Sequence, residues 1–294
     1  MRDVTGRLSG RVCVITGAAG GVGTATAQRL AQEGATVVGV DVVEHAVGEL
    51  CLRADVTDEA QVRDLYARIR NELGRIDVLF NNAGVNDPQD GSALDTSLET
   101  WSRVQTANLT SVFLCCKHGI PHLLANEPPG GSVINMATFL ALMGAATAQM
   151  AYSASRAGVL ALSRDLGVHL GKRGVRVNAL CMGPVDTPAL RELFADDSDK
   201  VAQRNVHMPM GRFGRAEEVA ATVAYLARRR RGLRDRVRVS AGWRDHRCVH
   251  HPDMIASDPG PGSRRRQPWR AASTTAWASS RISSRCASLS KLSA

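Results

Sequence analysis

The sequence lacks features that mark several large protein classes. Its seven cysteines contain no CxxC pair and none of the paired spacings that a zinc site needs. The N-terminal segment MRDVTGRLSGR has no apolar core of the kind that a secretory signal peptide carries. We therefore expect a reduced protein with cytoplasmic localisation and no metal site.

Charged residues are absent from residues 128–155, which makes this stretch a candidate membrane span. Asn135, Thr138, Thr147 and Gln149 lie within it, and a lipid-facing helix would leave such side chains unsatisfied. We expect instead a buried strand followed by a loop that helps to form a site. The sequence therefore predicts no membrane partner.

The basic excess is confined to one end of the chain. The whole chain has 37 Lys and Arg against 28 Asp and Glu, but residues 228–294 alone have 16 basic and 4 acidic residues. Residues 1–227 therefore carry 21 basic and 24 acidic residues, a net charge of −3. A uniformly basic, nucleic-acid-binding body is excluded. We expect one domain over residues 1–227 and a basic, largely disordered tail over residues 228–294.

Short apolar, β-branched runs alternate with helical patterns up to residue 227. This alternation predicts an α/β fold, with a doubly wound parallel sheet of Rossmann type and helices on both faces. The expected strands are residues 11–16, 35–40, 51–54, 76–80, 132–136 and 175–180. The expected helices are residues 22–33, 59–71, 98–126, 152–171 and 216–227.

A glycine-rich turn joins the first expected strand to the first expected helix. Gly17, Gly21 and Gly23 let backbone N–H groups approach a pyrophosphate more closely than residues with a Cβ would. Asp41 ends the next strand, where a carboxylate accepts hydrogen bonds from ribose hydroxyls and repels a 2′-phosphate. These residues predict an NAD site. A structural turn with a solvated Asp41 is the alternative.

The order and spacing of several motifs resemble the classical short-chain dehydrogenases/reductases over residues 8–227. The motifs are Thr16-Gly17 with Gly21 and Gly23, Asp55-Val56, Asn81-Asn82-Ala83-Gly84, Asn108 and Tyr152. The resemblance implies an oxidoreductase that transfers a hydride between NAD(H) and a small alcohol or ketone. It also implies the homo-oligomer that is usual in this family.

The resemblance implies roles for individual residues as well. Cofactor contacts are implied for Gly17, Gly21, Val22, Gly23, Asp41, Asp55, Val56, Asn82, Ala83, Gly84 and Thr187. Among them, Asp55 and Val56 would contact adenine, and Thr187 would contact the nicotinamide carboxamide. Asn108 would hold a helix bend and a water of the proton relay, although a buried helix asparagine can also be structural alone.

Tyr152 is the expected general acid/base. A phenol with its ordinary pKa of about 10 is a poor base near neutrality, so the chemistry needs a fixed cation beside it. Where the family has Tyr-x-x-x-Lys, this sequence has Arg156. The guanidinium keeps the charge but has no proton to relay. We expect the cofactor ribose contact of this position to survive and the proton relay to fail.

Two further positions depart from the family pattern. Thr138 stands where the family usually has a serine that hydrogen-bonds the substrate carbonyl, and it has an extra methyl group. It is either that carbonyl partner or a structural threonine. Met182 replaces the proline of the usual Pro-Gly pair. The expected substrate lid, residues 185–211, gives no indication of the substrate.

The tail is rich in Arg, Ser, Pro and Trp, as translations of GC-rich DNA in a wrong frame often are. Reading the degenerate codons of residues 227–246 one base later admits the Asp-Gly-Gly with which the family closes its last strand. We therefore infer a frame-shifted C-terminus, with a genuine basic tail for nucleic acid or membrane as the alternative. Charges within residues 233–240 predict that the last strand is missing and that residues 175–180 form an exposed edge.

Three functions follow in order of preference. The first is the NAD-dependent oxidoreductase with Tyr152, Thr138, Arg156 and Asn108 in its catalytic site. The second is a catalytically silent dinucleotide-binding or interaction protein, because Arg156 replaces the expected lysine. The third, a nucleic-acid binder that uses its tail, is the least favoured, and no nucleic-acid partner is expected.

Overall fold

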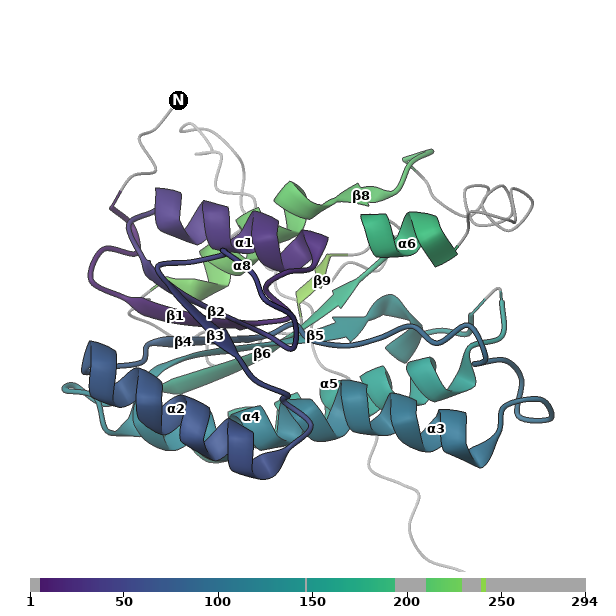
Figure 1. Cartoon of the computed structure of the whole chain (residues 1–294), viewed down its shortest axis with the longest axis horizontal. Helices are drawn as coiled ribbons and strands as arrows, with labels where there is room; N and C mark the ends of the chain where they lie inside the picture. The colour runs from purple at the N-terminus through teal and green to yellow at the C-terminus, as the bar shows by residue number, and fades with distance from the viewer. Residues whose placement is uncertain (1–5, 146, 194–209, 229–238, 242–294) are drawn as a thin grey trace, which may run out of the picture. The chain divides into compact units, whose positions relative to one another are not determined.

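The computed structural model describes residues 6–145, 147–193, 210–228 and 239–241 of the 294-residue chain. The chain divides into two units, Met1–Cys248 and Val249–Ala294, and the second lies outside the described residues. The first unit is built around a parallel sheet with the strand order β3-β2-β1-β4-β5-β6-β9 (Figure 1). The predicted α/β fold with a doubly wound parallel sheet is confirmed.

The strands of this sheet are short and almost wholly apolar. They are β1 (Val12–Thr16), β2 (Thr36–Asp41), β3 (Leu50–Arg53), β4 (Val78–Asn81), β5 (Gly131–Thr138), β6 (Val175–Met182) and β9 (Val239–Ala241). A separate pair, β7 (Val185–Asp186) and β8 (Gly214–Arg215), lies beyond the carboxyl end of β6 in the chain. The strand order reverses between β1 and β4, so a crevice for ligands is expected at the carboxyl ends of these two strands.

Helices cover both faces of the sheet (Figure 1). The helices are α1 (Gly21–Gln32), α2 (Glu59–Leu73), α3 (Leu98–Gln105), α4 (Ser111–Leu124), α5 (Met150–Leu170), α6 (Pro188–Leu193) and α8 (Ala216–Ala227). One apolar core joins the sheet to α2, α4 and α5, and a second joins the opposite face to α1 and α8. Alternate residues of β1 serve the two cores: Val12 and Val14 face the first, and Cys13 and Ile15 the second.

The predicted helix over residues 98–126 is interrupted. A π-helical segment, Thr106–Thr110, separates α3 from α4. The apolar periodicity on either side is continuous, so the pattern gave no sign of this break. The cause is a side-chain contact of Asn108, which belongs to the site described below.

The stretch without charges forms β5 and the loop after it, as predicted. Seven of the eight residues of β5 are buried, and the loop leads into α5. Within the described ranges, no helix is both long and apolar enough to cross a membrane.

The expectation that the last strand is missing is wrong for three residues. β9 pairs in parallel with β6, where Val239, Ser240 and Ala241 stand opposite Leu180, Cys181 and Met182. None of these three carries a charge, so the pairing places no charge in the sheet. The charged residues 234–238 lie outside the described residues, as does most of the predicted tail. The expected open edge at residues 175–180 is therefore closed at Leu180.

Candidate active site

The glycine-rich turn lies at the carboxyl end of β1, where backbone packing requires its glycines. Gly17 has φ +66°, and a Cβ there would lie 2.9 Å from the Cα of Ala83. A Cβ on Gly23 would lie 2.1 Å from the carbonyl oxygen of Gly17. Only glycine therefore lets the first turn of α1 approach this loop so closely.

Residues that follow β4 form hydrogen bonds to the same loop. The backbone N–H groups of Asn82 and Ala83 both donate to Thr16 Oγ1 over 3.1 Å. The Asn82 side chain donates to the carbonyls of Thr16 and Gly17, again over 3.1 Å. The sequence prediction omitted Thr16 from the site residues, although its place in the Thr16-Gly17 motif marked the position. Its hydroxyl ties β1 to β4 at the switch point.

Two predicted acidic residues lie beside each other at the ends of β2 and β3. Asp41 Oδ2 accepts from the N–H of Ala19 over 3.0 Å, so this carboxylate contacts the glycine-rich turn. The backbone N–H of Ala54 donates to the Asp41 carbonyl, which brings Asp55 into the same region. Asp55 Oδ1 accepts from the N–H and hydroxyl of Thr57. Val56, the other residue expected at the adenine, is buried.

Thr187 approaches the glycine-rich turn from the other side. A Cβ on Gly21 would lie 3.3 Å from Thr187 Cγ2. Thr187 also begins α6, because its Oγ1 accepts from the N–H of Leu190 over 3.3 Å. Val22 packs its side chain against the core under α1. The structure thus brings Thr187 beside Gly21 of the glycine-rich turn.

These residues fit a dinucleotide. Gly20, at the start of α1, supplies no side-chain cap, and the first turn of α1 contains no acidic residue. Such a helix start presents N–H groups to an anion without competition from a side chain. Asp41 supplies a carboxylate that matches a ribose. The donors and acceptors that a dinucleotide needs are therefore present along the carboxyl edge of β1, β2 and β4.

The catalytic candidates Tyr152 and Arg156 lie on one face of α5, one helical turn apart. The Arg156 Cζ atom lies 5.6 Å from the centroid of the Tyr152 ring, within the distance of a cation–π contact. The replacement arginine therefore keeps a positive charge beside the phenol.

The Arg156 guanidinium is enclosed by the protein. The residue is 4% exposed, and its Nη1 donates to the Met136 carbonyl on β5 over 2.9 Å. A Cβ on Gly84 would lie 1.9 Å from Arg156 Nη2 and 2.6 Å from Asn108 Oδ1. The Nε atom is buried without a hydrogen-bond partner among the described residues. The longer side chain thus fills the space between Gly84 and Asn108.

Asn108 explains the π-helical break. Its Oδ1 accepts from the N–H of Val85 over 2.8 Å, and its Nδ2 donates to the carbonyl of Val85 over 3.0 Å. The residue is 0% exposed. The side chain therefore joins the helix to the loop after β4, at the point where the family resemblance placed a helix bend.

Thr138 is the last residue of β5 and is 4% exposed. Its Oγ1 accepts from the N–H of Leu140 over 3.4 Å, which begins a short 3₁₀ turn. The hydroxyl hydrogen remains able to donate to a carbonyl. Thr138 stands opposite Met182 in the sheet, and Met182 packs into the core.

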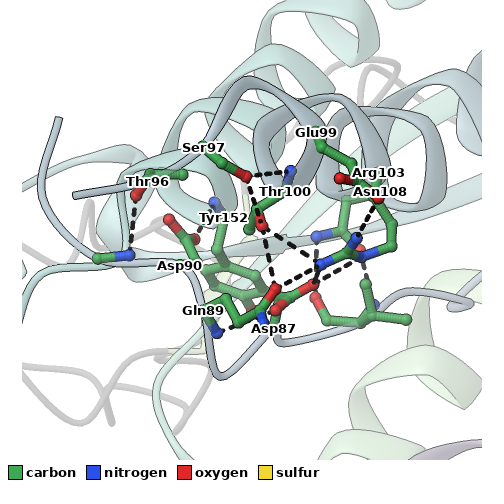
Figure 2. A network of polar contacts seen from close by, with 12 residues as sticks. Asp87, Gln89, Asp90, Thr96, Ser97, Glu99, Thr100, Arg103, Asn108 and Tyr152 are labelled. Carbon is green, nitrogen blue, oxygen red and sulfur yellow. Dashed lines mark hydrogen bonds and ion pairs between the residues drawn. The ribbon is translucent and has the colours of Figure 1, made fainter. Parts of the chain in front are cut away.

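A residue that the sequence reasoning missed contacts the catalytic helix directly. Asp90, in the loop between β4 and α3, accepts from the N–H of Ala151 over 2.9 Å. It also accepts from the N–H of Tyr152 over 2.8 Å (Figure 2). Aspartate is common in loops, and the contact spans more than 60 residues of sequence. Only the folded structure shows it.

Known proteins resemble the chain over this same region. A family model described as enoyl-(acyl carrier protein) reductase matches residues 17–233. Cis-4-hydroxycyclohexanecarboxylate dehydrogenase of Sinomonas cyclohexanicum is 40% identical over 228 residues, which cover 74% of this chain and 89% of that protein. Dehydrogenase/reductase SDR family member 6 of Rattus norvegicus is 36% identical over 232 residues, which cover 76% and 91%.

A solved structure agrees with these sequence matches. Ligand-free aldohexose dehydrogenase of Thermoplasma acidophilum has a TM-score of 0.70 at 29% identity and covers 76% of this chain and 89% of that chain. The glycine-rich turn, the Asn82 contacts and the Tyr152 helix all lie within the part of the chain that the family model matches. The chain belongs to the short-chain dehydrogenases/reductases, a family of nicotinamide-dinucleotide oxidoreductases that act on alcohols and ketones.

Proposed function

We propose that this protein oxidises an alcohol or reduces a ketone with NAD(H), and that Tyr152 is its general acid/base. The observation that carries the proposal is the position of Tyr152 beside a buried cation on α5. That cation packs against Gly84, and the two residues before Gly84 contact the glycine-rich loop. When bound, the nicotinamide ring supplies or accepts the hydride. The residues of the chain orient the substrate and transfer the proton.

The proton moves through the Tyr152 hydroxyl. In the reducing direction the phenol donates its proton to the carbonyl oxygen as that oxygen becomes an alkoxide, and in the oxidising direction the phenolate removes it. The Arg156 guanidinium places a positive charge beside the Tyr152 ring. The Thr138 hydroxyl donates a hydrogen bond to the same substrate oxygen and orients the carbonyl.

Proton supply to Tyr152 is the weak step of this scheme. Arg156 fills the space beside Asn108 Oδ1 and has effectively no dissociable proton near neutrality. Asn108 already uses both polar atoms of its side chain on Val85. We therefore infer that wild-type turnover is slow and that Tyr152 must exchange its proton by a route other than this cation.

NAD(H) is the proposed cofactor. Asp41 lies against Ala19 at the ribose end of the site, and residues 18–20 contain no basic side chain. A 2′-phosphate would meet this carboxylate, and residues 18–20 bring no positive charge to offset the repulsion. Gly17, Gly21, Gly23 and Asn82 would hold the pyrophosphate, Asp55 and Val56 would contact adenine, and Thr187 would contact the nicotinamide carboxamide.

The proposed substrates are secondary alcohols and their ketones. Two similar proteins carry such chemistry in their names: cis-4-hydroxycyclohexanecarboxylate dehydrogenase and meso-2,3-butanediol dehydrogenase of Serratia marcescens. Most of the predicted lid, residues 194–209, lies outside the described residues. The proposed substrate class is therefore defined by its secondary alcohol or ketone group.

A silent dinucleotide-binding protein is the second candidate. The enclosed guanidinium of Arg156 and its unpartnered Nε favour it, because a buried cation that is held by Met136 is poorly placed to serve a relay. We also propose that the protein forms a homo-oligomer in the cytoplasm. We further propose that its catalytic domain ends at residue 227 and that the tail after it is frame-shifted. Sequencing the gene across codon 228 tests the last of these, since a restored frame should end in Asp-Gly-Gly.

Fluorescence titration with NADH and NADPH tests the cofactor. We expect NADH to bind more tightly, and we expect Asp41→Ala to reduce the preference. A wild-type protein that binds NADPH more tightly would contradict the role of Asp41. Asp64→Ala, an exposed carboxylate on α2, is the matched control and should leave the preference unchanged.

A further inference from the structure

We propose that Asp90 is a positioning residue that holds the first turn of α5, and with it Tyr152, at the site. The inference rests on the proposed function of Tyr152. It concerns a residue on the loop between β4 and α3, more than 60 positions from the tyrosine in sequence.

The contact is short, paired and buried. Each carboxylate oxygen of Asp90 accepts one backbone hydrogen bond, Oδ1 from Ala151 over 2.9 Å and Oδ2 from Tyr152 over 2.8 Å. Asp90 is 8% exposed. Charge-assisted hydrogen bonds of this kind are roughly twice as strong as neutral ones.

The helix has no cap of its own at this end. Gln149, which precedes α5, makes no side-chain capping hydrogen bond, and the first turn of α5 contains no acidic residue. Residues 128–155, which comprise the chain before α5 and the first six residues of the helix, carry no charge at all. The free N–H groups and the positive end of the helix dipole therefore need an acceptor from elsewhere. Asp90 supplies it.

The neighbouring backbone is joined to the same loop. The N–H of Met150 donates to the Gly91 carbonyl over 3.2 Å, and the N–H of Gly91 donates to Thr96 Oγ1 over 2.9 Å. On the helix side, the Gln105 amide donates to the Ala151 carbonyl over 3.0 Å. The residue just before Tyr152 is thus held through its N–H and its carbonyl by two different elements.

A network of polar side chains fixes the loop that carries Asp90 (Figure 2). Arg103 on α3 donates to Asp87 Oδ2 over 2.8 Å and to Gln89 Oε1 over 3.3 Å. Asp87 Oδ1 also accepts from the N–H of Gln89 over 2.9 Å. Burial alone would raise the pKa of Asp87, but the hydrogen bonds from Gln89 and Arg103 lower it below its ordinary value. These contacts join the loop to α3.

Positioning matters here because proton transfer depends on geometry. A displacement of the reacting group by about 1 Å can lower a rate about 10²-fold. Tyr152 is the second of the two residues whose N–H groups Asp90 binds, so the loss of this carboxylate releases the tyrosine backbone itself. The cofactor contacts proposed at Gly17, Asp41 and Asn82 belong to other elements and should not change.

The test compares Asp90→Ala and Asp90→Asn with the control Asp95→Asn. Asp95 is an exposed carboxylate of the same loop, and its side chain contacts Ser92 rather than α5. We expect Asp90→Ala to lower kcat about 10²-fold while KM and the Kd for NADH hold. Asp90→Asn keeps one acceptor oxygen, so we expect a smaller decrease in kcat than in Asp90→Ala. Asp95→Asn should match the wild type.

Amide hydrogen exchange at Ala151 and Tyr152 supplies a readout that does not need turnover. We expect faster exchange at these two sites in both Asp90 variants, with exchange in the core of α5 unchanged. Unchanged exchange, or equal losses of kcat and of NADH affinity in Asp90→Asn, would overturn the proposal. If the wild type binds NADH but turns over no ketone, the proposed function fails, and the exchange data alone decide whether Asp90 holds Tyr152.

Discussion

The two ends of the proposed cofactor site differ in how closely they follow the family. At the adenosine and pyrophosphate end, the glycine-rich turn, Asp41 and Asn82 match the family pattern and contact one another as a dinucleotide site requires. At the catalytic end, Thr138 and Arg156 replace the usual serine and lysine. Arg156 is packed against Gly84 instead of standing open to a ligand.

The difference teaches that binding and chemistry are separable in this fold. The proposed binding end is built from close backbone approach and short polar side chains at the ends of β1, β2 and β4. A Cβ on Gly17 or Gly23 would lie less than 3.0 Å from a backbone atom. The proposed catalytic end consists of two side chains of α5, and we propose that Asp90 positions it. We therefore expect some substitutions to change turnover while cofactor affinity holds, and others to change affinity while the catalytic residues stay intact.

The largest effect is expected for Tyr152→Phe. The change removes only a hydroxyl, so the proton-transfer contribution of about 10²–10⁴-fold should disappear from kcat. The Kd for NADH and the thermal unfolding temperature should stay at the wild-type values. Steady-state kinetics measure the change in kcat, and a binding titration on the same preparation measures the Kd for NADH. A Tyr152→Phe protein with wild-type turnover refutes the proposed mechanism.

Arg156→Lys should raise turnover, by about 10²-fold if the missing relay group limits the rate. The shorter side chain vacates the space between Gly84 and Asn108 and restores a dissociable proton. NADH affinity should change far less than kcat. Arg173→Lys, an arginine outside the site, is the control. An unchanged kcat would mean that the cation is wrongly assigned.

Gly23→Ala should destroy the binding end without touching the catalytic residues. Its Cβ would lie 2.1 Å from a backbone oxygen, and overpacking of this kind costs about 1–3 kcal/mol or more. We expect lower thermal stability and weaker NADH binding together. Gly20→Ala is the matched control for stability, since its Cβ would lie 3.5 Å from the nearest backbone oxygen. Equal unfolding temperatures in the two variants would contradict the packing argument.

The smallest effect is expected on acid stability through Glu218. Hydrogen bonds from Arg212 and from the N–H of Arg215 lower the pKa of this carboxyl to about 2 from an ordinary 4.5. A lowered pKa in the folded state stabilises the protein above pH 4.5, and the contribution is lost as the pH falls toward 2. Glu218→Gln should therefore show a flatter stability curve over this range. A curve parallel to the wild type would contradict the role of these contacts.

Much of the fold was predictable because its signals are local. The apolar strands and the amphipathic helices gave the parallel sheet, and helix Ala216–Ala227 was predicted to the residue. Other features depend on contacts between distant residues. The π-helical break at Asn108 follows from a bond to Val85, and the first turn of α5 is held by Asp90. Neither contact produces a periodic pattern in the sequence from which it could be predicted.

The site was predicted as a set of positions rather than as an arrangement. Motif spacing predicted roles for Tyr152, Arg156 and Asn108, but it did not predict that the guanidinium would be enclosed beside Gly84. The last strand was missed because charges at residues 234–238 were taken to represent the whole segment. The three uncharged residues of β9 were enough to pair with the end of β6.

The most direct test of the account follows the hydride itself. NADH deuterated at the transferred position is incubated with the wild type, with Arg156→Lys and with a panel of cyclic and acyclic ketones, and the alcohols are analysed by mass spectrometry. The account predicts deuterium on the carbinol carbon with both proteins, faster with Arg156→Lys, at similar NADH affinity. NADH binding by both proteins without deuterium transfer from either would contradict it and identify a silent dinucleotide-binding protein.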